Sequence, residues 1–147
     1  MPQTLLALLA LSLAAFLMLG QQQDAGSHER ATFRAEAEMA SVTLADQVLD
    51  ELALLPASAT GAAPSPLTLD TARSLDEADG RSATRQIALQ DGTASFRVEV
   101  EVERIKKQGD RFVSTADPTP FRNVRVRVEG PLDATAVLER VLVDLDQ

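Results

Sequence analysis

The pattern of hydrophobic and polar positions first predicts helix. Leu5 to Gly20 is an apolar run interrupted only by Ser12, and no ionisable side chain occurs before Asp24. From Phe33 onward, apolar residues recur at steps of three and four, which predicts one hydrophobic stripe along a helix. The stripe consists of Phe33, Ala37, Ala40, Leu44, Val48, Leu52 and Leu55. Pro56 is expected to end the helix, because proline lacks the backbone N–H and disfavours helical geometry in the residue before it.

The apolar run and the stripe together predict one long helix. From about Pro2 to Leu55 it would be near 80 Å long, at about 1.5 Å per residue. A helix of that length requires a partner along it. Gly20 and Gly26 each cost about 1 kcal/mol relative to alanine, so we expect a kink or a melted turn in this region. The alternative is a plain anchor joined by a hinge to a separate helix.

The composition changes after Pro56. Residues 57–66 are rich in alanine, serine and proline and have little to bury, so they predict a connector. Beyond it, Leu67 and Leu69 suggest a short extended piece. Ser74 to Gly80 is expected to be an acidic loop.

A hydrophobic period of two then predicts four strands. The apolar positions are Phe96, Val98, Val100 and Val102 in one strand, Val124, Val126 and Val128 in a second, and Val137, Val141, Val143 and Leu145 in a third. Thr84 to Gln90, ending at the turn signal Asp91-Gly92, is the fourth. Because one face of each strand is apolar and the other polar, these strands predict an antiparallel sheet with one face on a core.

These elements predict an α+β fold. A long N-terminal helix, made of a membrane or filament segment and an amphipathic half, is expected to pack on a small antiparallel β-sheet. The expected parts are a hydrophobic transmembrane or filament-core helix at 1–20, its amphipathic continuation at 21–56, a connector and acidic loop at 57–83, and an antiparallel β-domain at 84–147.

The apolar run has a length that fits more than one role. A bilayer-spanning helix needs about 20 apolar residues and at least about 17, whereas the core of a signal peptide has about 7–15. The N-terminus Met1-Pro2-Gln3 has no basic side chain, and Met18-Leu19-Gly20-Gln21 is a poor cleavage site. We therefore expect a retained membrane helix, with a cleaved signal peptide and a buried soluble helix as alternatives.

The orientation of that helix is left open by its flanks. The positive-inside rule compares the numbers of lysine and arginine residues at the two ends of a membrane helix, and here the first basic residues are Arg30 and Arg34. The rule therefore specifies the orientation only weakly. We expect the soluble part to lie outside the cytoplasm.

The charge and the cysteine content exclude several classes of protein. The chain has 14 basic and 22 acidic residues and a formal net charge of -8, so nucleic-acid binding is not expected. It has no cysteine, which excludes disulfides, thiolate zinc sites and thiol nucleophiles.

Few residues suggest chemistry. The one histidine, His28, has no orienting partner or nucleophile beside it and is expected to be a solvated helix residue. Asp76, Glu77 and Asp79 do not match the ligand spacing of a calcium loop, so we expect a structural loop. The phosphate-binding, dinucleotide-binding, nucleophile-elbow and zinc-protease motifs do not occur. We therefore expect no enzyme, no cofactor and no metal site.

Two charged rows accompany the predicted strands. Glu99, Glu101 and Glu103 form an acidic row, and Arg125 and Arg127 form a basic one. If the two strands are neighbours, these rows are expected to form surface ion pairs across the strands.

The order of these features resembles that of type IV pilins and pseudopilins. These have an apolar helix that continues into an amphipathic one, a connector and then an antiparallel sheet. Ser74-Leu75-Asp76-Glu77-Ala78-Asp79-Gly80, followed by the strands at 96–103, 123–128 and 137–145, is similar to the acidic "DD-x-x-G" loop and sheet of minor pilins of the mannose-sensitive haemagglutinin type. The resemblance covers nearly the whole chain and implies a structural subunit of a cell-surface filament.

The N-terminus departs from the prepilin pattern of a short basic leader ending in glycine, followed by Phe-Thr-Leu-x-Glu. This chain offers Gln3-Thr4-Leu5-Leu6-Ala7, preceded by Met1-Pro2, so the leader, the glycine and the glutamate are missing. We expect a pilin-like protein that keeps Met1 and the whole apolar segment and assembles by apolar packing.

The expected function is therefore structural: a pilin-like subunit that assembles through its apolar N-terminal helix into a cell-surface filament or pseudopilus. The expected assembly residues are Leu5, Leu6, Ala7, Leu8, Leu9, Ala10, Leu13, Ala14, Phe16 and Leu17. The expected partners are copies of this chain or other pilin-like subunits, with the inner membrane holding the protein before assembly and the cell surface or an extracellular filament as its destination. The alternatives are a single-pass, membrane-anchored binding module outside the cytoplasm and an exported enzyme or inhibitor with a cleaved signal.

Overall fold

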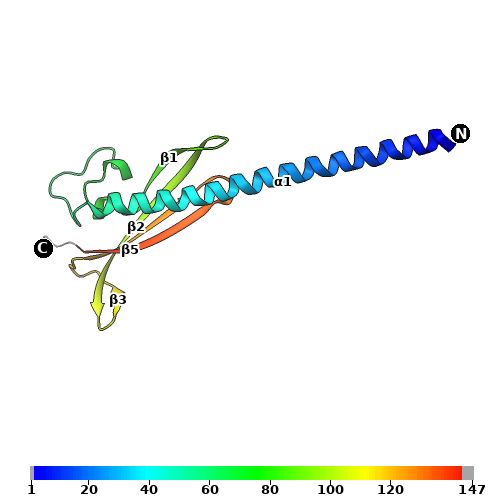
Figure 1. Cartoon of the computed structure of the whole chain (residues 1–147). Coiled ribbons are helices and arrows are strands. Elements are labelled where there is room, and N and C mark those ends of the chain that lie inside the picture. Colours follow the sequence, from blue (N-terminus) through cyan, green and yellow to red (C-terminus); the bar gives the residue numbers. More distant parts are fainter. Residues whose placement is uncertain (1, 144–147) are drawn as a thin grey trace.

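The chain forms one long helix, a five-stranded antiparallel sheet and three short helical turns (Figure 1). The computed structural model describes the backbone of residues 2–143 and the side chains of Met18 and of residues 26–143. Helix α1 is Pro2–Ala53, and the strands are β1 Arg81–Leu89, β2 Gly92–Gln108, β3 Arg111–Ser114, β4 Phe121–Glu129 and β5 Thr135–Val143. The short turns are η1 Leu69–Thr71, α2 Leu75–Ala78 and η2 Pro131–Asp133.

The long strand β2 organises the sheet. The strand order is β1-β2-β4-β5, every neighbouring pair is antiparallel, and β3 pairs with the end of β2. Ile105 of β2 is opposite both Ser114 of β3 and Phe121 of β4, so β3 lies on the same edge of β2 as β1. Strands β1 and β5 are therefore the two outermost strands of the main path.

The core lies between the inner face of this sheet and the C-terminal half of α1. Ala37, Leu44, Val48, Leu49 and Leu52 are buried on the helix side, which the stripe predicts in part. The strands supply the opposite wall, with Phe96, Val98, Val100, Val124, Val126 and Val128 all buried. Fully burying such a side chain contributes about 1.5–3 kcal/mol, so this contact is the main stabilising interaction of the fold.

Gly130 allows the closest approach within this core. A Cβ at this position would lie 2.5 Å from Cε1 of Phe96 and 3.3 Å from the Ser41 hydroxyl of α1. The missing side chain therefore lets the Phe96 ring fill the space between the helix and the start of η2.

The expected fold class is wrong in two respects. Among the residues that the structure describes, no helix is long and apolar enough to cross a membrane. The physical reason is that the described stretch of α1 from Gly26 onward carries charged side chains on nearly every turn, including Glu29, Arg34 and Glu38. The sheet is also not a small element beside the helix, because it has five strands and dominates the described fold.

The strand boundaries explain why the sheet was underestimated. The apolar alternation covers only residues 96–103 of β2, whereas the strand runs through 17 residues, Gly92–Gln108. Strand β3 has no alternating pattern of useful length and was not predicted. The strands expected near Thr84, Val124 and Val137 are confirmed as β1, β4 and β5. The face expected for the last strand is wrong, because Val137, Val141 and Val143 are exposed, whereas Ala136, Leu138 and Leu142 face the core.

Three local expectations are also corrected. Helix α1 continues without interruption through Gly20 and Gly26, so the kink or melted turn is absent from it. The predicted extended piece at Leu67 and Leu69 includes the 3-10 turn η1, and the acidic loop includes the helical turn α2. Ser74 caps α2 by accepting a hydrogen bond from the Glu77 backbone N–H at 3.2 Å, which stabilises a helical start where only a loop was expected.

The orientation of β4 can be tested with two adjacent substitutions. Val126 is completely buried, whereas Arg125 faces water. Val126→Asp should unfold the protein, because it buries an unpaired carboxylate. Arg125→Glu should lower the free energy of unfolding by well under ~1 kcal/mol, because exposed cross-strand pairs contribute little. Thermal melts of both variants measure this, and equal, small effects would show that the inner face has been assigned wrongly.

Candidate assembly surfaces

The N-terminal half of α1 extends beyond the sheet, as Figure 1 shows. We call residues 2–25 of this helix the stem and the rest of the described chain the head. Among the helix residues whose side chains the structure describes, the first in the buried core is Ala37. Met18, the one stem residue whose side chain the structure describes, is 71% exposed. The stem is therefore a helix that the sheet of its own chain does not cover.

The expected assembly residues all lie on the stem. They are Leu5, Leu6, Ala7, Leu8, Leu9, Ala10, Leu13, Ala14, Phe16 and Leu17. Their backbone belongs to α1, but their side chains lie outside the described part of the structure. Their role in assembly stays a prediction.

Polar contacts attach α1 to both sides of the sheet. Arg140 of β5 donates to Asp50 at 2.7 Å and to Asp46 at 3.0 Å. On the other side, Glu36 of α1 accepts a hydrogen bond from the backbone N–H of Gln90 at 2.8 Å, directly after β1. These contacts fix the direction in which the stem leaves the head, in addition to the apolar core.

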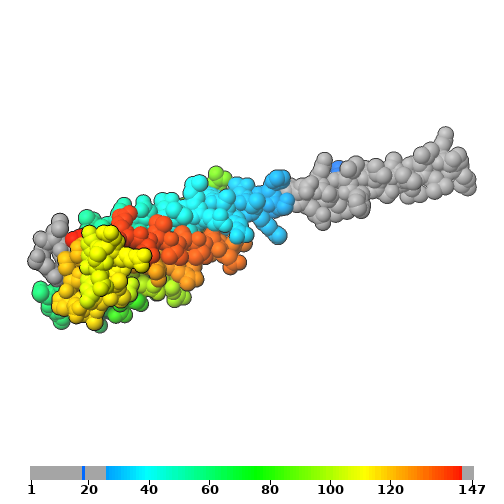
Figure 2. Space-filling model, turned by 90° about the horizontal axis from the view of Figure 1, so that it is seen from below, coloured from blue at the N-terminus to red at the C-terminus, as the bar shows by residue number. Residues whose placement is uncertain are grey.

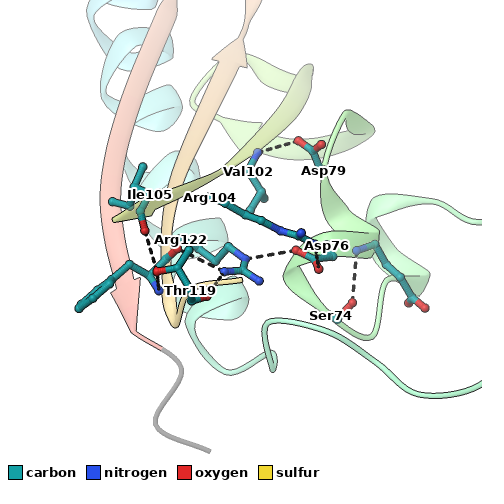
Figure 3. Close-up of polar contacts among 10 residues, drawn as sticks. Ser74, Asp76, Asp79, Val102, Arg104, Ile105, Thr119 and Arg122 are labelled. Atoms are coloured by element: carbon teal, nitrogen blue, oxygen red, sulfur yellow. Dashed lines mark hydrogen bonds and ion pairs between the residues drawn. The ribbon is translucent and has the colours of Figure 1, made fainter. Parts of the chain in front are cut away.

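A charge cluster around one buried arginine holds the acidic turn against the sheet (Figure 3). The Arg122 guanidinium of β4, with a side chain only 4% exposed, donates through Nε to Oδ1 of Asp76 at 3.2 Å. Arg104 of β2 donates to the other carboxylate oxygen at 2.9 Å. Arg122 also donates to the Thr119 carbonyl at 2.5 Å. Asp76 is thus the shared acceptor of two arginines from neighbouring strands.

The other two acidic residues of the turn are also used internally. Asp79 accepts the backbone N–H of Val102 at 2.7 Å, in the gap on the edge of β2 between β1 and β3. Glu77 accepts from Arg73, whose side-chain hydrogen bond lowers the pKa of that carboxyl below its usual value. The turn therefore closes the sheet edge, as expected for a structural loop.

The remaining candidates for chemistry are isolated. His28 is exposed on α1, and its backbone carbonyl accepts a hydrogen bond from the Thr32 hydroxyl at 2.9 Å. Among the described residues, no group of three or more acidic or histidine side chains is placed to hold a metal ion. The geometry of this part of the chain gives no reason to assign a reaction.

The outer face of the sheet carries the two charged rows. Glu99 lies opposite Arg127 and Glu101 opposite Arg125, so the predicted strand neighbourhood is confirmed. Only the second pair is an ion pair, at 3.4 Å. Arg127 instead pairs with Glu129 on its own strand at 2.7 Å, and Glu99 likewise pairs with Arg97 of β2. These pairs are exposed and belong to the open surface of a sheet.

Sequence reasoning missed the charge cluster around Asp76. The reason is that Arg104 and Arg122 fall at inward positions of their strands, where a charged residue interrupts the apolar alternation. An arginine at an inward position opposite a second arginine requires an acidic partner from another segment. Asp76, in the turn that was expected to be acidic, is that partner.

The cluster can be tested with an isosteric change. Asp76→Asn removes the charge that two arginines share, one of them buried, and should lower the free energy of unfolding by about 1–3 kcal/mol. The matched control is Asp117→Asn, because Asp117 pairs with Lys106 in water with its side chain 72% exposed. Urea denaturation should show a lower midpoint for the first variant and an unchanged midpoint for the second. A wild-type midpoint for Asp76→Asn would contradict the assigned role of the cluster.

Comparisons with known proteins found no relative of this chain. No family model matches the chain, and no curated protein or solved structure is detectably similar to it.

Proposed function

We propose that this protein is a structural, pilin-like subunit that assembles through its stem into a filament or pseudopilus. The observation that carries the proposal is the 52-residue helix α1, whose N-terminal half extends beyond the sheet while the described core residues of α1 lie in its C-terminal half (Figure 1). At about 1.5 Å per residue, the stem contributes roughly 36 Å of helix beyond the head. A helix of this kind requires an external partner.

The sequence of the stem indicates what that partner is. Leu5 to Gly20 contains no charged residue, and leucine and alanine dominate it. A helix that is apolar on all sides is stable only where it is buried, because water contact costs about 25 cal/mol per Å² of apolar surface. A bundle of like helices buries that surface on every side.

The small residues of the stem favour such a bundle. Ala7, Ala10, Ala14 and Ala15 occur along the apolar run, and small side chains let helix backbones approach closely. The charges of α1 begin at Asp24, near the junction with the head. This division of polarity favours assemblies with stems inside and heads outside.

The attachment of the stem supports a structural role. The head fixes the helix through the buried core and through Arg140 and Glu36, so the stem is a continuous extension of the head rather than a separate segment. The arrangement also agrees with the resemblance to pilins and pseudopilins that the sequence suggests. A continuous helix of this kind couples the position of each stem to the position of its own head.

Assembly can be tested with one charge in the stem. Ala14→Asp should abolish filaments and oligomers while the head stays folded, because an unpaired carboxylate would have to enter the dry bundle. Negative-stain microscopy of sheared surface material from wild-type and variant cells measures assembly. Circular dichroism of the purified full chain measures folding.

The matched control is Ala31→Asp, the same change at an exposed position of α1 outside the stem. It should leave assembly unchanged. If the wild type forms no filament or oligomer, or if Ala14→Asp assembles as well as the wild type, the proposal is wrong. A single-pass binding module anchored by this helix then becomes the better account.

A further inference from the structure

The sheet has two free edges of equal length. Strands β1 and β5 each have nine residues and lie at opposite ends of the strand order. Val102 directs its N–H toward the β1 side of β2, so by alternation the even-numbered residues of β1 and the odd-numbered residues of β5 direct their backbone groups outward. Within the described chain, the backbone groups of Thr84, Gln86, Val137 and Val141 make no hydrogen bond outside the sheet.

The two edges lack several of the features that usually prevent strand pairing, but each has an inward-facing charged residue, Arg85 in β1 and Arg140 in β5, which carboxylates of the same chain already pair. Neither strand contains proline or lysine, and both pair with their neighbours in unbroken register, without a bulge. Proteins commonly use these devices to stop one edge from adding to another. Both edges therefore remain competent to pair.

A groove leads to the edge of β1. It has a volume of about 510 Å³ and lies between α1 and the five consecutive residues Arg85–Leu89. Consecutive residues of a strand point to opposite faces of the sheet, yet all five of these residues line the groove. The groove therefore opens on the edge of the strand and not on one face. Ala40, Leu44, Ile87 and Leu89 give it an apolar lining, which suits the side chains of an added strand.

The strand directions determine how two copies fit. Four antiparallel strands form the main path, so β1 and β5 run in opposite directions. When two copies stand side by side in the same orientation, β1 of one faces β5 of the next as an antiparallel neighbour. The same orientation keeps the stems parallel, as a filament requires. Such a contact between β1 and β5 joins two different surfaces of identical copies. It can therefore be repeated from copy to copy without limit, unless the rotation between successive copies closes them into a ring.

The charges of the two edges are complementary. The charged residues of β1 are Arg81 and Arg85, and Arg81 makes no ion pair within the described chain. Beside β5 lie Glu139 and the α1 carboxylates Asp46 and Asp50, whose side chains stay 59% and 67% exposed although both contact Arg140. Carboxylates beside β5 thus face Arg81 of β1, which favours this pairing over β1 with β1, whereas Arg85 already pairs with Asp70 and Glu51 of its own chain.

We propose that β1 of one copy pairs antiparallel with β5 of a second copy, which continues the sheet from head to head. This inference rests on the proposed function, since stems held in one bundle raise the effective concentration of neighbouring heads. In this arrangement, the inward side chains of β1 from one copy lie next to Val42 in α1 of the other copy. Val42 is 50% exposed in the single chain, so the contact would cover it.

Cysteine crosslinking of the full chain tests the pairing, because the natural sequence contains no cysteine. Gln86→Cys is combined in turn with Val137→Cys, Glu139→Cys and Val141→Cys. The three double variants test three registers of β1 against β5, and all four side chains lie on the outer face of the sheet. Oxidation of assembled material should convert at least one double variant into a ladder of covalent multimers. Each single variant should stay monomeric, because a disulfide then requires β1 to meet β1 or β5 to meet β5.

The matched control is Gln86→Cys with Leu138→Cys, whose second side chain lies on the inner face and should give no ladder. Arg81→Glu in the reactive double variant should reduce the ladder, since it reverses the complementary charge. The inference is overturned if none of the three double variants forms a ladder, or if single variants form dimers. Microscopy of the same samples separates the two proposals: filaments without a ladder overturn the edge pairing alone, whereas the absence of both overturns the filament as well.

Discussion

The packing of the C-terminal half of α1 on the inner face of the sheet is the interaction on which the rest of the structure depends. The helix supplies the apolar wall that the sheet needs, and Val98, Val126 and their neighbours supply the opposite wall. Without the helix, one face of a five-stranded sheet would be exposed apolar surface. Because this same helix continues into the stem, the interaction that stabilises the head also determines where the stem begins and in which direction it extends.

The polar contacts refine this arrangement. Asp76 secures the acidic turn to β2 and β4, and Arg140 secures α1 to β5. Figure 2 shows the result from below, with α1 lying along β5 and the hairpin of β2 and β3 at the end of the head. The head is an elongated body whose long axis follows the helix. Its shape suits lateral packing of parallel copies, with the sheet edges facing their neighbours.

Much of the fold is predictable from periodicity because burial is one-sided. The stripe from Phe33 to Leu55 and the alternation around Val98 identify the helix and the central strands. The ends of β2 and the whole of β3 are not predictable in this way, since their residues alternate weakly and depend on pairing. The cluster at Asp76 is hidden for a related reason: two inward arginines contradict the apolar pattern until a third segment supplies the charge. The stem residues were identified from composition alone, and the free edges become visible only from the strand order.

The central claim is that the stem is buried among other stems. Electron cryomicroscopy of assembled material measures this most directly, because the 52-residue helix is long enough to be traced in a density map. The account predicts a central bundle of parallel stems with the heads on the outside. Assemblies held together by the heads alone, with stems pointing away from one another, would contradict it.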